Sequence, residues 1–331
     1  MAPRSENSPV QLTDRCLALL GAFLLLGSCQ VTPSGDAYES AEQAAAQADW
    51  DEAARRWYQL HLAEEVKREQ TYLEAARAFQ ANGDSEGACA LIRRGLRDFP
   101  RSESLYDLHS HILEDSGFSR AAERSYAELV RIAPNHLDGL IGLGRVRMDL
   151  DLERAAEEPL RRAVVLDPAC LEPQMHLARV RQTRGDPVGA YGWYTSAIQL
   201  GARDPLFLLD AAGVADEEVV LQADPAAREK ALVWLDLILA VEPQVTLAHF
   251  LRGAHLEALG RLDEATLSYL RAVETDPSCL SALTRLARIF SDEGDSVRTR
   301  EFVGRALEIE ENPERREALE GLLVEAPEGS L

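Results

Sequence analysis

Lysine and aromatic residues are scarce in this sequence, and each scarcity excludes a class of protein. Only Lys67 and Lys230 are lysines among the 35 basic residues, and the 56 acidic residues bring the net charge of the 331-residue chain to −21. Phosphate backbones would repel such a surface, so we expect no nucleic-acid partner. Aromatic residues make up 6% of the chain and hydrophobic residues 46%. This balance favours helices that pack through alanine and leucine.

Cysteine pairs are missing as well. The chain has five cysteines and no Cys-x-x-Cys motif, so a zinc or redox site has no support. Cys89, Cys170 and Cys279 are spread too widely for a disulfide framework. We therefore expect no metal and no structural disulfide.

Catalytic motifs are also absent. The sequence has no Gly-x-Ser-x-Gly, no P-loop and no His-Glu-x-x-His, and its glycines at 139, 142 and 144 do not follow a strand pattern. His109 and His111 are two residues apart in a helical pattern and point to different faces. The sequence predicts a non-catalytic protein without cofactors.

The N-terminus carries one short apolar run. Cys16 to Leu26 is 11 residues long, whereas a membrane-spanning helix needs about 20. Arg4 and Arg15 precede the run and small residues follow it, which is the layout of a cleaved secretory signal.

The residues Leu26-Gly27-Ser28-Cys29 resemble the lipobox of bacterial lipoproteins. The resemblance implies a signal peptide at 1–28, lipidation of Cys29 and a short membrane tether at 29–35. It also implies a lipid-anchored protein of the cell envelope, and Gln30 implies outer-membrane sorting in a cell with two membranes. The alternative is a plain signal peptide, which would give a secreted or periplasmic protein.

The prolines repeat at a fixed interval. Pro100, Pro134 and Pro168 are 34 residues apart, and Pro243 and Pro277 repeat that interval. The stretch 247–277 contains a helical pattern, a Gly-Arg-Leu-Asp turn, a second helical pattern and Asp-Pro. This period of helix, turn and helix resembles tetratricopeptide repeats. The resemblance implies an all-α fold, a right-handed superhelical solenoid of about eight helix-turn-helix units with a C-terminal capping helix.

The solenoid is expected to span residues 36–324, followed by a disordered tail at 325–331. Its units are expected at 35–68, 69–102, 103–136, 137–170, 171–204, 205–245, 246–279 and 280–313, with the cap at 314–324. Unit 205–245 is irregular: we expect a first helix from about Leu206, a loop around Gln222 to Asp224, and a second helix with Trp234 and Leu235 facing inward. Small residues such as Gly144 and Gly253 should allow close helix packing, while Tyr126, Tyr194 and Tyr269 fill the space between units.

The ninth residue of each unit faces the concave groove in the tetratricopeptide family. Here these positions hold Gln43, Arg77, His111, Arg145, Arg179, Ala254 and Arg288. We expect the cationic members, Arg77, His111, Arg145, Arg179 and Arg288, to form a ladder that attracts an acidic segment, because arginine makes paired hydrogen bonds with carboxylates. Met148, Met175 and Phe250 would add apolar anchors. The alternative is internal neutralisation by Asp107, Asp115, Asp149 or Glu172.

These features predict a lipid-anchored, non-catalytic scaffold that binds a protein or peptide partner in its groove and reaches the membrane through its N-terminal lipid. The competing interpretation is a structural or self-associating spacer without a groove ligand. Reversal of groove charges should abolish binding in the first case and have no effect in the second.

Overall fold

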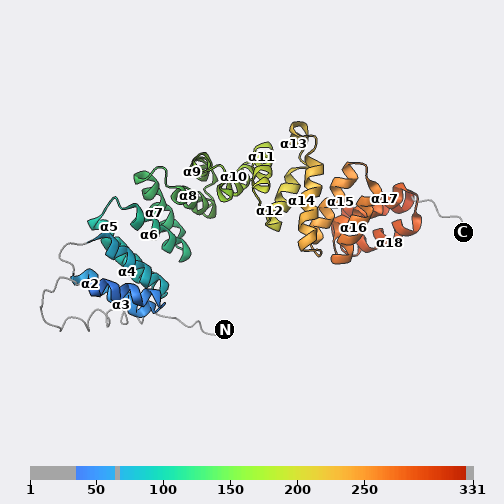
Figure 1. Cartoon of the computed structure of the whole chain (residues 1–331). Helices are drawn as coiled ribbons and strands as arrows, with labels where there is room; N and C mark the ends of the chain where they lie inside the picture. Colours follow the sequence, from blue (N-terminus) through green and yellow to red (C-terminus); the bar gives the residue numbers. More distant parts are fainter. Residues whose placement is uncertain (1–34, 64–67, 326–331) are drawn as a thin grey trace. The chain divides into compact units, whose positions relative to one another are not determined.

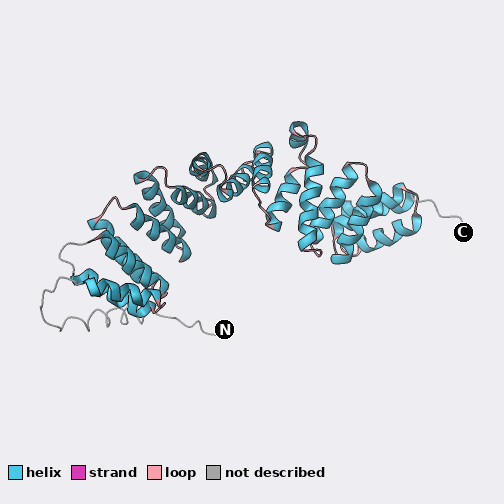
Figure 2. Ribbon diagram, viewed as in Figure 1, coloured by secondary structure: helices cyan, strands magenta, loops and turns pink. Residues whose placement is uncertain are grey.

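The computed structural model describes residues 35–63 and 68–325, and across these residues the only regular secondary structure is helix (Figures 1 and 2). The expected signal peptide, Cys29, the tether and the last six residues of the tail lie outside the described residues. None of the described helices is long and apolar enough to cross a membrane. The all-α prediction is confirmed.

The chain divides into two compact units, residues 1–116 and 117–331, and the division falls between the two helices of the repeat expected at 103–136. The first unit contains α2 (Gly35–Ala46), α3 (Trp50–Ala63), α4 (Glu69–Ala81), α5 (Ser85–Asp98) and α6 (Glu103–Asp115). Consecutive helices in this unit pack against one another.

The second unit repeats the same arrangement over a longer stretch. It contains α7 (Ser119–Ile132), α8 (Leu137–Asp149), α9 (Glu153–Leu166), α10 (Leu171–Thr183), α11 (Pro187–Gln199), α12 (Pro205–Val214), α13 (Glu218–Ala223), α14 (Ala227–Val241), α15 (Thr246–Ala258), α16 (Leu262–Thr275), α17 (Leu280–Asp292), α18 (Ser296–Leu307) and α19 (Pro313–Glu325). Each long helix packs on the next, and α8 also touches α10, as α12 touches α15. The first helices α8, α10, α12, α15 and α17 form what we call the first-helix face.

The turn between α10 and α11 shows why the chain reverses where it does. Gly185 has a φ of +68°, a left-handed conformation that suits glycine because it has no Cβ. The next residue, Asp186, caps α11 by accepting a hydrogen bond from the Gly189 backbone N–H at 2.9 Å. Pro187 then occupies the first turn of α11, where its missing N–H costs nothing.

Large tyrosines and glycines meet between helices, as the sequence predicts. Tyr126, Tyr194 and Tyr269 are fully buried. A Cβ on Gly253 would lie 2.5 Å from Cε1 of Tyr269, so only glycine lets α15 and α16 approach this closely. The Tyr269 hydroxyl donates a hydrogen bond to Glu257 Oε2 at 2.6 Å, which satisfies its buried polar end.

The irregular unit differs from its expectation in one element. The short helix α13 (Glu218–Ala223) contains Gln222, around which a loop was expected. The helix forms because Val220 is fully buried and joins the core around α11. The chain then turns at Asp224, whose carboxylate accepts hydrogen bonds from the Tyr191 hydroxyl at 2.8 Å and from Lys230 at 2.6 Å. Beyond it, Trp234 and Leu235 on α14 are buried, as expected.

Candidate functional site

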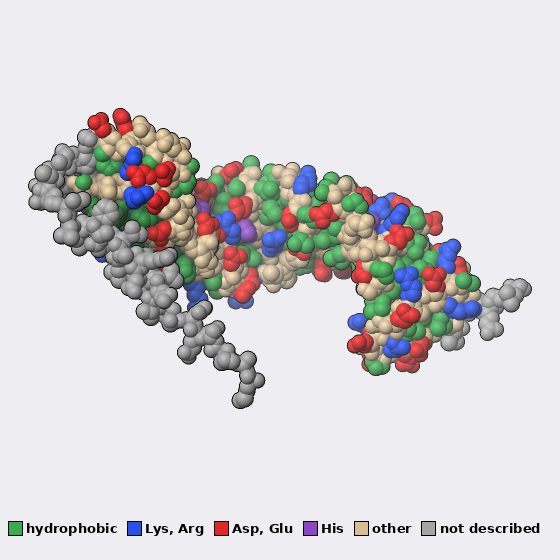
Figure 3. Space-filling view, turned by 90° about the horizontal axis from the view of Figure 1, so that it is seen from below, with side chains coloured by type: hydrophobic (Ala, Val, Ile, Leu, Met, Phe, Trp, Pro, Cys, Tyr) green, Lys and Arg blue, Asp and Glu red, His purple; other side chains and the backbone are tan. Residues whose placement is uncertain are grey.

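On the face of the molecule drawn in Figure 3, charged side chains of both signs are interspersed. The local pairing of each arginine therefore decides whether it is available to a ligand. An arginine with a carboxylate already in hydrogen-bond contact offers an external carboxylate less than an unpaired one does.

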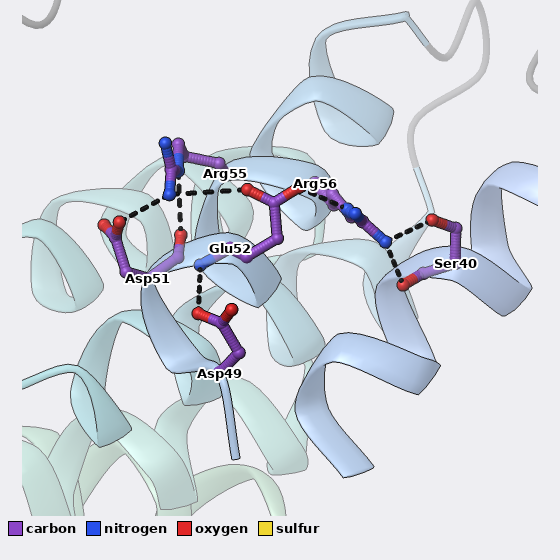
Figure 4. A network of polar contacts seen from close by, with 6 residues as sticks. All are labelled: Ser40, Asp49, Asp51, Glu52, Arg55 and Arg56. Atoms are coloured by element: carbon purple, nitrogen blue, oxygen red, sulfur yellow. Dashed lines mark hydrogen bonds and ion pairs between the residues drawn. The ribbon is translucent and has the colours of Figure 1, made fainter. Parts of the chain in front are cut away.

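The arginines near the start of the first unit are committed to partners within the chain (Figure 4). Arg55 pairs with Asp51 at 2.5 Å, and Arg56 pairs with Glu52 at 2.6 Å. Arg56 also donates to the backbone oxygen of Ser40 at 2.9 Å, which ties α3 to α2. This network stabilises the first helix pair and leaves no unpaired guanidinium among the residues drawn.

The two ladder positions of the first unit also have local partners. Arg77 on α4 is exposed and pairs with Glu74 of its own helix at 3.0 Å. Nε2 of His111 on α6 lies 3.5 Å from Asp107, and this contact is an ion pair only when the imidazole is protonated. Asp107 is one of the residues proposed from the sequence to neutralise the ladder.

In the second unit, Arg145 and Glu172 form an ion pair between α8 and α10 at 2.6 Å. His176, one turn further along α10, lies 3.8 Å from the same carboxylate oxygen. The hydrogen bond from His176 and the charge of Arg145 lower the pKa of Glu172 against the opposing effect of burial. Glu172 therefore neutralises Arg145 within the chain, as the alternative interpretation of the ladder predicted.

Arg179, the next rung, has no carboxylate within 4.0 Å among residues 35–63 and 68–325. The side chain is half-buried on α10, and its guanidinium lies 6.0 Å from the centroid of the Phe207 ring on α12. Glu172 follows Arg145 by 27 residues, and the residue that follows Arg179 by 27 is Leu206. Leucine therefore stands where the previous unit supplies its neutralising glutamate.

The surroundings of Arg179 combine an apolar and a polar group. Leu206 is the second residue of α12 and is 68% exposed. Asp210, one turn further along α12, is half-buried, and burial raises the pKa of its carboxyl while Arg179 opposes the rise. Phe207 is fully buried against Tyr194, with ring centroids 4.7 Å apart, and fixes the position of the guanidinium. We call Arg179, Leu206, Phe207 and Asp210 the Arg179 site.

The Arg179 site can hold a carboxylate in two parallel hydrogen bonds, since guanidinium donors match carboxylate geometry. The ring beneath Arg179 restricts the side chain, so less conformational entropy is lost on binding. Leu206, the residue before Phe207, adds exposed apolar area. This arrangement favours an acidic residue that is followed or preceded by an apolar one.

The remaining residues singled out from the sequence have different environments. Arg288 on α17 is exposed and has no carboxylate within 4.0 Å in the described part of the chain. Met148, Met175 and Phe250 are partly buried and pack on the core, which reduces the area they offer to a ligand. Of the other ninth-position residues, Gln43 is exposed and Ala254 is half-buried.

Two histidines, His255 and His109, are surrounded by the protein to an extent that affects their protonation. His255 is 1% exposed, and its Nε2 lies 3.0 Å from the backbone oxygen of Ala212. Burial lowers the pKa of His255, and it lowers the pKa of His109 to about 4. Within the described ranges, no group of three or more His, Cys, Asp or Glu side chains is placed to hold a metal ion.

Sequence reasoning identified Arg179 but missed Leu206 and Asp210. The signal was present, because the interval of 27 residues that separates Arg145 from Glu172 can be counted from any ninth-position arginine. To use this interval, one must know that the carboxylate paired with a ninth-position arginine is the second residue of the first helix in the following unit. The structure shows this.

The sequence is similar to two human proteins over less than half of its length. It is 28% identical to human tetratricopeptide repeat protein 7B over 136 residues, which are 41% of this chain. It is 27% identical to tetratricopeptide repeat protein 7A over 138 residues, or 42% of this chain. The matched stretch covers only 16% of each human protein. No protein-family model matches the sequence.

Solved structures extend the similarity. The C-terminal part of a repeat protein from Cytophaga hutchinsonii aligns with a TM-score of 0.56 at 13% identity, covering 75% of this chain and 98% of that one. YrrB, described as a tetratricopeptide protein with an unusual peptide-binding site, aligns with a TM-score of 0.51 at 14% identity, covering 59% and 96%. The fold is a tetratricopeptide repeat solenoid. Proteins of this fold are typically non-catalytic scaffolds for protein interaction.

Proposed function

We propose that this protein is a lipid-anchored scaffold of the cell envelope that binds a protein or peptide partner at the Arg179 site. The unpaired, half-buried guanidinium of Arg179 on the first-helix face is the observation that carries the proposal. In an acidic protein, a positioned cation with no carboxylate in hydrogen-bond contact attracts a carboxylate from outside. The tetratricopeptide fold supports a protein or peptide as the source of that carboxylate.

The expected ligand is an acidic segment with an apolar residue next to the carboxylate. Arg179 would bind the carboxylate, and Leu206 would cover the apolar side chain. Asp210 sets a limit on ligand charge, because a segment with several adjacent carboxylates would be repelled by it.

The test places a glutamate at residue 206, the position equivalent to that of Glu172 in the previous unit. Leu206→Glu recreates beside Arg179 the arrangement of Arg145 and Glu172, so the guanidinium is neutralised without being removed. Leu247→Glu is the matched control, because Leu247 is also the second residue of its helix and is 51% exposed, but no ninth-position arginine precedes it by 27 residues. Capture of partners from cross-linked membranes of the source cell should lose a protein with Leu206→Glu and retain it with Leu247→Glu. If both variants capture the same proteins as the wild type, the Arg179 site does not bind the partner.

The anchoring part of the proposal depends on the resemblance around Cys29, which lies outside the described residues. Metabolic labelling with an alkyne fatty acid should mark the wild-type chain and not Cys29→Ala. The variant should also leave the membrane fraction. Equal labelling of both chains would contradict lipidation at Cys29. It would not affect the proposal that the Arg179 site binds a partner.

A further inference from the structure

We propose that copies of this chain associate head to tail, with the C-terminal helix α19 of one copy bound to an arginine-rich face over α7 and α9 of the next. The arginine face consists of Arg120 and Arg124 on α7 and of Arg154 and Arg161 on α9. All four side chains are exposed.

The four members of the arginine face form no ion pair with the described part of the chain. None of them has a carboxylate within 4.0 Å there. Four glutamates of α7 and α9 are paired with other arginines: Glu123 with Arg147 at 2.9 Å, Glu128 with Arg131, Glu157 with Arg181 and Arg184, and Glu158 with Arg162. The four arginines therefore stay available to a carboxylate from a second copy.

Helices α7 and α9 run side by side in the same direction. Arg147 joins Glu123 near the start of α7 to the backbone oxygen of Ala155 near the start of α9. At the other end, Arg162 on α9 donates to the backbone oxygen of Pro134, just past the end of α7. The two arginine pairs therefore lie on neighbouring helices.

A hollow with apolar and charged walls accompanies the arginine face. It has a volume of about 450 Å³ and runs along α9, and it is lined by Val165, Leu166, Asn135, Arg154, Arg161, Arg162, Glu157 and Glu158. Val165 is 80% exposed and offers apolar area beside the arginines. A helix laid into this hollow would contact both arginines and cover the valine.

The C-terminal region carries the complementary charge. Residues 308–320 include six glutamates and two arginines. Five of these glutamates recur every third residue, are exposed, and have no ion pair with another described residue; they are Glu308, Glu311, Glu314, Glu317 and Glu320. Three of them lie on α19, within about one third of its circumference, opposite the side that packs on the core.

The spacings of the two surfaces match. Arg154 and Arg161 are seven residues apart, or about 10 Å along α9 at 1.5 Å per residue. Glu314 and Glu320 are six residues apart, or about 9 Å along α19. The two rises agree to about 1 Å, although Glu314 and Glu320 point about 120° apart around α19 while Arg154 and Arg161 point nearly the same way.

The contact must join two copies. Helices α10 to α18 lie between α9 and α19 in the packed series of the second unit, so the two surfaces cannot meet within one unit (Figure 1). A contact between two different surfaces of identical chains is heterologous and continues into longer assemblies unless it closes into a ring.

Ionic strength should tune this association. The net charge of −21 makes copies repel at long range, while the proposed contact acts at hydrogen-bond distance. At about 0.1 M salt the Debye length is about 10 Å, which screens the long-range repulsion and spares the contact. At about 1 M the Debye length is about 3 Å and the contact weakens too. Association should therefore be strongest near 0.1 M and be lost near 1 M.

Analytical ultracentrifugation of the full-length chain in non-ionic detergent tests the proposal with two reversed variants. The first carries Arg154→Glu and Arg161→Glu, and the second carries Glu314→Arg and Glu320→Arg. Each alone should be monomeric where the wild type forms larger species. Their equimolar mixture should form larger species again, because the intact tail meets the intact face and the reversed face meets the reversed tail. The chain with all four changes should associate for the second of these reasons.

The control variant carries Arg97→Glu and Arg101→Glu, two exposed arginines of the first unit without ion pairs to described residues, and should associate like the wild type. A wild-type chain that stays monomeric at every salt concentration overturns the proposal. So does a mixture of the two reversed variants that stays monomeric. Loss of binding to phosphatidylglycerol vesicles by the first variant, with unchanged self-association, would instead assign the arginine face to lipid headgroups.

Discussion

The close packing of α8 on α9 gives a prediction whose size can be worked from the structure. Gly144 lies inside α8 and is buried, and a Cβ built on it would be 2.4 Å from Cγ and 2.5 Å from Cδ2 of Leu160. Leu160 is fully buried, so it has no free space into which to move. Gly192 provides the control, because it lies inside α11, is exposed, and has no atom within 4 Å of its built Cβ.

The two substitutions should change stability in opposite directions. Gly192→Ala should raise the free energy of unfolding by about 1 kcal/mol, the difference in helix propensity. Gly144→Ala has the same gain but adds overpacking that costs about 1–3 kcal/mol, and the very short contacts place it at the upper end. We expect a net loss of about 1–2 kcal/mol.

Guanidinium unfolding followed by circular dichroism at 222 nm measures both effects. Leu160→Ala alone should cost about 2–5 kcal/mol through the cavity it leaves. Because a methyl group on residue 144 would partly fill that cavity, the double variant should be more stable than the sum of the single effects by about 1 kcal/mol or more. Equal midpoints for Gly144→Ala and Gly192→Ala would refute the claim that glycine is required for this helix contact.

Two further predictions concern charge. Burial lowers the pKa of His255, and it lowers the pKa of His109 from 6.5 to about 4, so both favour the neutral form when folded. The unfolded chain binds more protons below pH 6.5, and stability should therefore fall as the pH drops from 6.5 towards 4, less steeply in His255→Gln. The Arg147–Glu123 pair joins α8 to α7 with both side chains 21% exposed, so a double-mutant cycle should give a coupling of about 1 kcal/mol, above that of exposed pairs. A coupling near zero would mean that this pair does not contribute to helix packing.

The 34-residue period predicted the helices because each unit combines the same local signals. A glycine with positive φ, a capping aspartate such as Asp186 and a proline act within a few residues of one another, so they can be recognised from the sequence. Tyr126 and Tyr194 are 68 residues apart, two periods, and Tyr269 holds the equivalent position after the longer irregular unit, so all three were predicted for the same reason. The short helix α13 was missed because its formation depends on burial of Val220 against α11, a contact between distant residues.

The candidate site was only partly predictable because ion pairing depends on side chains from neighbouring units. The sequence named both Arg145 and its partner Glu172, but it gave no reason to treat Arg179 differently from Arg145. Distance decides the difference: a carboxylate lies 2.6 Å from Arg145, and the described residues place none within 4.0 Å of Arg179. The division of the chain after Ser116 was not anticipated either, because the third repeat keeps the ordinary pattern on both sides of it.

The position of the Arg179 site follows from the irregularity of the next unit. Regular spacing would place a first helix at residue 205 whose second residue could neutralise Arg179, as Glu172 neutralises Arg145. The chain does begin α12 at Pro205, but it fills the second position with Leu206 and then departs from the 34-residue period by adding α13. The same unit therefore breaks both the period and the ion-pair ladder. A glutamate in place of Leu206 would be four residues before Asp210 on α12, so the repulsion between the two carboxylates would offset part of the gain from pairing with Arg179. Leu206→Glu should accordingly change the free energy of unfolding by less than about 1 kcal/mol while it removes the interaction.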